Sequence, residues 1–231
     1  MARHNALQML GRSGNPALNN NTFKNEGVAV GQAMTLQGTV NKTGILLALL
    51  VLSATYTWSL FFQAGNPAAV RPAMIGGAIG GLIFALVTIF KKHWAGVTAP
   101  IYALLQGLFL GGISAFFESQ FPGIVIQATG LTLGTLASLL FLYKLGIIKP
   151  TENFRLMIVS ATMGIGVLYL ISFVMNMFGS AGIGFIHSNG LFGIGFSLFV
   201  VAIAALNLVL DFDFIEQGAE QGAPKYMEWF G

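Results

Sequence analysis

Six long apolar runs dominate the sequence and restrict the folds open to it. Each run is close to the ~20 residues that an α-helix needs to cross the hydrocarbon core of a bilayer. The runs cover residues 44–62, 72–90, 96–117, 123–143, 156–178 and 191–210. They predict an all-α integral membrane protein with six transmembrane helices in this chain.

The composition supports this interpretation and excludes several classes of protein. Hydrophobic residues make up 55% of the 231 residues and charged residues only 8%, whereas a soluble domain carries about 25% charged residues. The absence of cysteine excludes disulfides, thiolate nucleophiles and cysteine-ligated metal sites. The basic residues are scattered over the tail and the loops rather than gathered in one patch, so we expect no nucleic-acid partner.

The lysines and arginines predict the orientation of the chain. Residues 1–42 read as a polar N-terminal tail and residues 43–231 as the transmembrane bundle. If the tail is cytoplasmic, the outer loops contain only Arg71, and the inner segments contain the other ten of the 11 basic residues: Arg3, Arg12, Lys24, Lys42, Lys91, Lys92, Lys144, Lys149, Arg155 and Lys225. Inner loops carry an excess of Lys and Arg. We therefore predict a cytoplasmic N-terminus.

An acidic cluster ends the sixth run and is the main candidate for a functional site, because acids near a bilayer are costly and mark function by default. It consists of Asp211, Asp213 and Glu216. If the helix continues, Asn207 and Asp211 share one face and Asp213 points away from them. We expect Asp211 to face the bundle interior and Asp213 to face inner water, so that Asp211 sets any response to pH. The alternative is that all three acids end the helix in solvent.

A polar line on the third run is a second candidate. Tyr102, Gln106, Ser114 and Glu118 recur at steps of four or eight residues. They predict either a water path with Glu118 at its outer mouth, or hydrogen bonds between helices with an interfacial acid.

Pairs of glycines four residues apart predict close helix packing. They are Gly76 with Gly80, Gly77 with Gly81, and Gly107 with Gly111. These pairs support a tight bundle and carry no information on activity.

No catalytic constellation is complete in the sequence. No His or Cys pair has metal-ligand spacing, and no second aspartate lies inside another run to partner Asp211 in a membrane protease. We therefore predict that the protein is not an enzyme, with a membrane protease or hydrolase as the remaining alternative.

Three segments resemble the Bax inhibitor-1 family, also called the transmembrane Bax inhibitor motif family, in a bacterial branch. They are residues 41–47 (NKTGILL), 99–118 (APIYALLQGLFLGGISAFFE) and 210–216 (LDFDFIE). The resemblance runs from about residue 34 to the end of the sequence. It implies a bundle of six helices around a central seventh, which is either missing from this chain or only begun at Phe230.

The same resemblance implies a pH-sensitive calcium leak gated by an acidic pair at the inner face. Asp211 matches the first acid of the pair, with Asp213 as the nearby alternative, and Asp211 is the expected calcium ligand. Asn207, Glu216, Glu118 and Gln106 are expected in supporting positions. In some relatives a basic residue at the inner end of the second helix holds the sixth-helix acid, a position matched here by Lys91 and Lys92.

The leading hypothesis is accordingly a pH-gated calcium leak channel in a bacterial inner membrane. Calcium is the expected permeant ion, the bilayer is the expected partner, and no other cofactor is expected. The alternative is a non-conducting regulator that interacts with membrane proteases or stress-response proteins.

Overall fold

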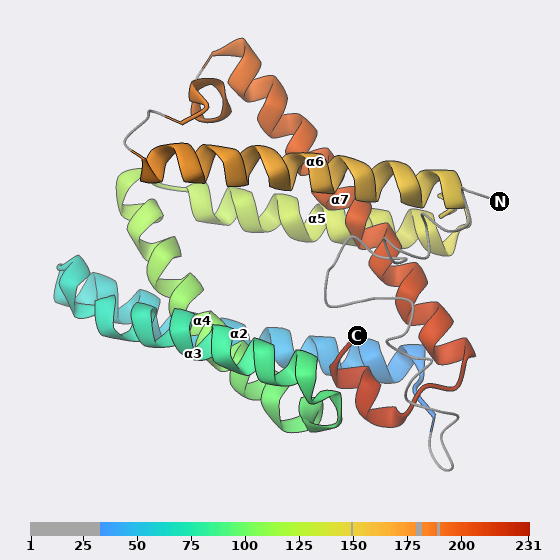
Figure 1. The fold of residues 1–231 in the computed structure, drawn as a ribbon. Helices are drawn as coiled ribbons and strands as arrows, with labels where there is room; N and C mark the ends of the chain where they lie inside the picture. The colour runs from blue at the N-terminus through green and yellow to red at the C-terminus, as the bar shows by residue number, and fades with distance from the viewer. Residues whose placement is uncertain (1–32, 149, 179–181, 189) are drawn as a thin grey trace. The chain divides into compact units, whose positions relative to one another are not determined.

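Six long helices follow one another in the computed structural model, which describes residues 33–148, 150–178, 182–188 and 190–231 (Figure 1). They are α2 (Leu36–Ala64), α3 (Arg71–Phe90), α4 (Ala95–Gln120), α5 (Ile124–Lys144), α6 (Glu152–Met177) and α7 (Leu191–Glu220). Four 3₁₀ turns follow α2, α3, α6 and α7: η2 (Pro67–Ala69), η3 (Lys92–Trp94), η4 (Gly184–His187) and η5 (Lys225–Trp229). All six helices are long and apolar enough to cross a membrane. The predicted all-α membrane fold with six spans is confirmed.

α2 and α7 extend furthest beyond the apolar runs that predicted them. α2 begins at Leu36 rather than at Gly44, because the Thr35 side chain accepts a hydrogen bond from the Gly38 amide and caps the helix. α7 continues to Glu220 rather than ending at Leu210. The acidic cluster therefore lies within a helix. Phe230 lies directly after η5. The start of a seventh helix at this residue stays a prediction.

The described residues divide into two compact units. The first, residues 134–214, is called the α6–α7 unit below. The second, residues 33–133 with 215–231, is called the α2–α4 unit. Within the described residues the chain passes between the two units twice, inside α5 and inside α7.

Buried glycines let the helices of the α2–α4 unit approach closely. A Cβ atom at Gly107 would collide with the Leu50 carbonyl of α2, and one at Gly111 would collide with the Ala54 carbonyl. A Cβ at Gly77 would meet the Leu105 carbonyl of α4. Backbones this close to one another are typical of membrane helices that pack through small residues.

The glycine prediction is confirmed on one face of α3 and not on the other. Gly77 and Gly81 are buried. By contrast, a Cβ at Gly76 would meet no described residue within 4 Å, and among the same residues one at Gly80 would meet only the Leu105 side chain. Spacing alone did not distinguish these two overlapping pairs.

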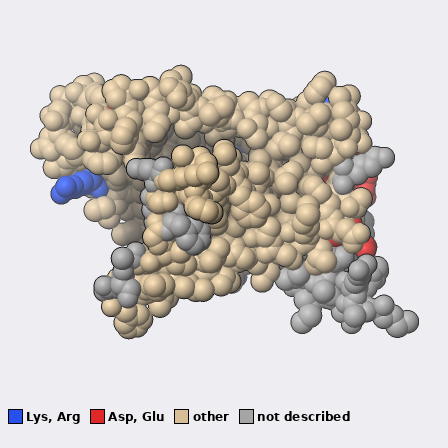
Figure 2. Space-filling model, turned by 90° about the horizontal axis from the view of Figure 1, so that it is seen from above, with Lys and Arg blue, Asp and Glu red and all other residues tan. Residues whose placement is uncertain are grey.

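Large apolar side chains remain exposed along the helices, which fits a lipid-facing surface. Phe90, Phe178 and Leu191 are each more than three quarters exposed, at 78%, 78% and 85%. Uncharged residues cover most of the described surface in Figure 2, and charged side chains show only as small areas. A soluble monomer rarely exposes apolar patches of this extent.

Candidate ion-binding site

The acidic cluster lies on a continuous stretch of α7 in the α6–α7 unit. α7 packs against α6 through an apolar core that contains Ile158 and Val159 from α6 and Ile203 and Leu210 from α7. This core fixes the rotation of α7. Residues 207 and 211, one turn apart, consequently face α6 together.

Asn207 and Asp211 line a cavity of about 310 Å³, which confirms that they share a face. The other lining residues come from both helices: Thr162, Ile165, Val200, Ile203 and Ala204. The wall is mainly apolar, and its polar groups are a hydroxyl, an amide and a carboxylate. A cavity of this kind offers oxygen ligands in a medium of low polarity.

A short hydrogen-bond chain fixes the orientation of the Asn207 amide. The Thr162 hydroxyl donates to the Ile158 carbonyl at 2.9 Å, so its oxygen is left to accept. Asn207 Nδ2 donates to that oxygen at 2.8 Å and to the Ile203 carbonyl at 2.9 Å. The amide oxygen, Oδ1, is buried and has no hydrogen-bond partner among the described residues. It is available as an acceptor or a cation ligand close to Asp211.

Asp213 is buried and ion-paired, contrary to the expectation that it faces water. Its side chain accepts from Arg155 Nη2 at 2.5 Å, and the residue is only 9% exposed. Arg155 lies near the start of α6, where Thr151 caps the helix by accepting from the Phe154 amide. Sequence analysis treated Arg155 only as a topology signal and missed this contact.

The two aspartates therefore have different surroundings. Asp211 is half-buried beside an unpaired amide oxygen of Asn207 and an apolar cavity, whereas the negative charge of Asp213 is balanced by Arg155. No group of three or more His, Cys, Asp or Glu side chains placed to hold a metal ion occurs within the described ranges. The arrangement can offer a cation a few oxygen ligands in passing but no closed protein cage.

The predicted supporting residues lie in the α2–α4 unit, except for Asn207 at the cavity. Glu118 accepts from the Gly123 amide at 2.6 Å and from the Val125 amide at 3.1 Å, so it ties the end of α4 to the start of α5. A Cβ at Gly81 would lie 3.2 Å from the Gln106 amide oxygen, which places Gln106 at the α3–α4 contact. The Glu118 contacts fit an acid that ends α4, whereas the hydrogen bonds between helices expected for the rest of the polar line stay a prediction. Glu216 is half-buried in the last turns of α7.

The two lysines suggested as partners of the acid lie at the end of α3. Lys91 is the C-terminal cap of that helix and is exposed. Lys92 Nζ lies 5.9 Å from the centre of the Phe230 ring. The pairing of either lysine with Asp211 or Asp213 stays a prediction, whereas Asp213 forms an ion pair with Arg155.

The family model described as Bax inhibitor 1 like matches residues 15–231 of the chain. The match covers all six long helices and the acidic cluster. Searches among curated proteins and among solved structures found no match.

Proposed function

The chain belongs to the Bax inhibitor 1 like family, and from this premise we propose that it is a pH-sensitive calcium leak channel rather than an enzyme. Asp211 and Asp213 are its ion-binding and pH-sensing acids. The observation that carries the proposal is the position of Asp211, which lines a mainly apolar cavity beside the Asn207 amide oxygen on a helix apolar enough to span a membrane. An acid in such a setting is a functional candidate by default.

Asp211 and Asn207 supply the oxygens that a calcium ion needs in passage. Calcium is a hard cation that takes six to eight oxygen ligands, from carboxylates, amide carbonyls and water. The Asp211 carboxylate and the Asn207 Oδ1 atom provide such oxygens, and water completes the shell. A site with few protein ligands suits a leak, because an ion held by a full cage leaves slowly.

The Arg155–Asp213 pair is the element that responds to pH. When Asp213 is ionised, Arg155 is held against it and links the start of α6 to α7. Protonation of Asp213 removes the negative charge and releases Arg155. The leak therefore increases as the cytosolic pH falls.

The membrane and the orientation follow from charge. Ten of the 11 lysines and arginines fall on one side of the six spans, which supports a cytoplasmic N-terminus in a bacterial inner membrane. The α6 end with Arg155 and the α7 segment with Asp211 and Asp213 then face the cytoplasm. Calcium is the transported ion, and no further cofactor is required.

Calcium flux into liposomes tests the proposal. The purified protein is reconstituted, and an enclosed calcium dye is followed at pH 6 and pH 8, with Asp211→Asn compared with the parent. Asp211→Asn should reduce flux about tenfold or more at both values, since loss of one carboxylate ligand weakens a calcium site. Glu220→Gln is the matched control, because Glu220 is an exposed acid at the end of the same helix.

Two results contradict the proposal. If the parent is no more permeable to calcium than empty vesicles, the protein is the non-conducting regulator given as the alternative. If Asp211→Asn and Glu220→Gln behave alike while the parent conducts, the cavity at Asp211 is not on the ion path.

A further inference from the structure

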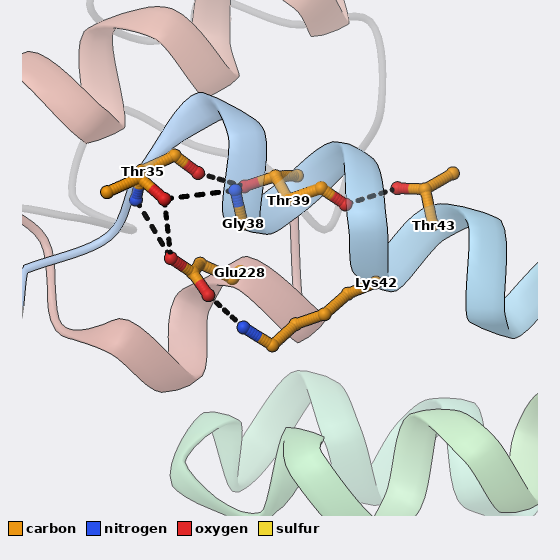
Figure 3. Close-up of polar contacts among 6 residues, drawn as sticks. All are labelled: Thr35, Gly38, Thr39, Lys42, Thr43 and Glu228. Carbon is orange, nitrogen blue, oxygen red and sulfur yellow. Dashed lines mark hydrogen bonds and ion pairs between the residues drawn. The ribbon is translucent and has the colours of Figure 1, made fainter.

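Glu228 occupies a closely fitted seat at the start of α2, in the α2–α4 unit (Figure 3). Its Oε1 atom accepts from the Thr35 amide and from the Thr35 hydroxyl, each at 3.0 Å. Its Oε2 atom forms an ion pair with Lys42, two helical turns further along. Glu228 is only 3% exposed. An acid this deeply buried must be paired and hydrogen-bonded to remain charged.

Gly38 completes the seat by having no side chain. A Cβ atom at this position would collide with the carboxylate carbon and both oxygens of Glu228. Figure 3 shows the carboxylate between the first turn of α2 and the Lys42 side chain. At Gly44, in the same helix, no atom of the part of the chain that the structure describes lies within 4 Å of the corresponding position.

The residues around Glu228 join the same contact. The Met34 amide donates to the Ala223 carbonyl at 2.6 Å. Lys42 Nζ lies 5.5 Å from the centre of the Trp229 ring, a distance typical of a cation–π contact. Met227 is fully buried. Residues 223–231 thus contact residues 34–42 through a backbone hydrogen bond, the Glu228 carboxylate and a cation–π contact.

We propose that residues 223–231 form a strap that closes over the start of α2 only when the Glu228 carboxylate is seated, and that its opening frees the end of α7. If the strap closed while the Glu228 carboxylate was out of its place, that charge would be buried beside Met227 without partners, which is strongly unfavourable. The strap therefore has two discrete states instead of a range of partly closed ones.

The second half of this inference rests on the proposed function. α7 ends at Glu220, directly before the strap, and carries Asp211 and Asp213. A closed strap fixes the C-terminal end of that helix by covalent continuity. When the strap opens, Asp213 is held less firmly against Arg155, and the leak increases.

A single cysteine reports the state of the strap, because the native chain has none. Met227→Cys places a thiol at a fully buried strap position, and its rate of labelling by a water-soluble maleimide in nanodiscs measures how often the strap opens. Val70→Cys is the control for unfolding of the whole unit. Val70 is 1% exposed and lies in the core with Phe61 and Ala115.

Gly38→Ala is the decisive variant, and Gly44→Ala is its matched control. Both add one methyl group to α2, but only the first displaces the Glu228 carboxylate. We expect Gly38→Ala to speed labelling of the thiol at position 227 about tenfold or more, because a group forced into a filled site is destabilising. Labelling with Gly44→Ala should match the parent, and labelling of the thiol at position 70 should stay slow in both. Equal labelling of the two alanine variants at position 227 would overturn the strap.

A double-mutant cycle tests the role of charge. Lys42→Met leaves Glu228 without its cation and should speed labelling at position 227 about tenfold or more. Glu228→Gln keeps the acceptor for Thr35 and should have a smaller effect. In the double variant labelling should be slower than with Lys42→Met alone, since no unpaired charge remains. If the two effects simply multiply, the carboxylate does not control the strap.

Calcium flux then separates this inference from the proposed function. Gly38→Ala should raise flux at pH 8 at least about twofold over Gly44→Ala, because the end of α7 is freed more often. Faster labelling with unchanged flux overturns the link to α7. If the parent shows no flux, the channel proposal fails while the labelling results still decide whether the strap exists.

Discussion

Asp211 and Asp213 are separated by one residue, yet their surroundings differ in kind. A helix turns about 200° over two residues, so the two side chains meet different neighbours. Asp211 reaches the cavity with Asn207, and Asp213 reaches Arg155. Because Asp213 is buried and paired with Arg155, we assign the proposed pH response to the Arg155–Asp213 pair instead of to Asp211. Asp211 stays the proposed ion ligand.

A double-mutant cycle on Arg155 and Asp213 tests this division at the scale of single residues. Asp213→Asn and Arg155→Gln should each raise calcium flux at pH 8 toward the pH 6 value and flatten the dependence on pH, because either change removes the ion pair. The double variant should be no leakier than either single one, with a coupling energy of about 0.5–3 kcal/mol. Effects that add independently, or an unchanged pH profile in Asp213→Asn, would show that the pair does not gate the leak.

At the scale of the helices, contact between small residues holds the α2–α4 unit together. Buried side chains such as Thr57 and Ser53 bond backbone carbonyls of their own helix. They leave a smooth surface for Gly107 and Gly111 of α4. Since lipid gives no hydrophobic driving force between helices, this close fit is what remains to specify the packing.

Gly107→Ala should therefore destabilise the unit. Its new methyl group meets the Leu50 carbonyl and the Ser53 hydroxyl, and overpacking of this kind costs about 1–3 kcal/mol. Gly76→Ala adds the same group where none of the described residues lies within 4 Å and should be neutral or slightly stabilising. Thermal unfolding in detergent, followed by circular dichroism, gives the comparison. A melting temperature that falls equally in both variants would mean that helix flexibility, rather than fit, explains the loss.

Hydropathy predicted the helices well but not their ends. The apolar runs identified all six spans, because a span must be apolar over the thickness of the bilayer. The start of α2 at Leu36 depends on the Thr35 cap and on Glu228, which is distant in sequence. The continuation of α7 past Leu210 depends in part on Arg155, which balances Asp213. Contacts between distant residues are not visible in local periodicity.

The candidate site, like the helices, was predicted only in part from the sequence. The shared face of Asn207 and Asp211 follows from helical geometry, and the structure confirms it. The burial of Asp213 did not follow, because it depends on which side of α7 meets α6. Arg155 carried one weak signal, an arginine directly before a predicted span at an inner loop, and nothing in the sequence distinguished it from the other inner cations.

At the scale of the whole molecule, the charge distribution predicts how the chain crosses the membrane. Arg71 is the one basic residue assigned to the outer loops, and Lys91 and Lys92 lie at the other end of α3. Loops rich in Lys and Arg resist translocation. The outer end of α3 is therefore predicted to be its start, beside η2, and the inner end to be η3.

Single cysteines at the two ends of α3 test this orientation. Ala68→Cys and His93→Cys replace exposed residues in η2 and η3 and keep every lysine and arginine. In intact cells an impermeant maleimide should label the thiol at position 68 and leave the thiol at position 93 unlabelled until the membrane is opened. Labelling at position 93 alone would reverse the orientation and place Asp211 and Asp213 at the outer face, where cytosolic pH does not reach them. Labelling at both positions in intact cells would mean that α3 does not span the membrane.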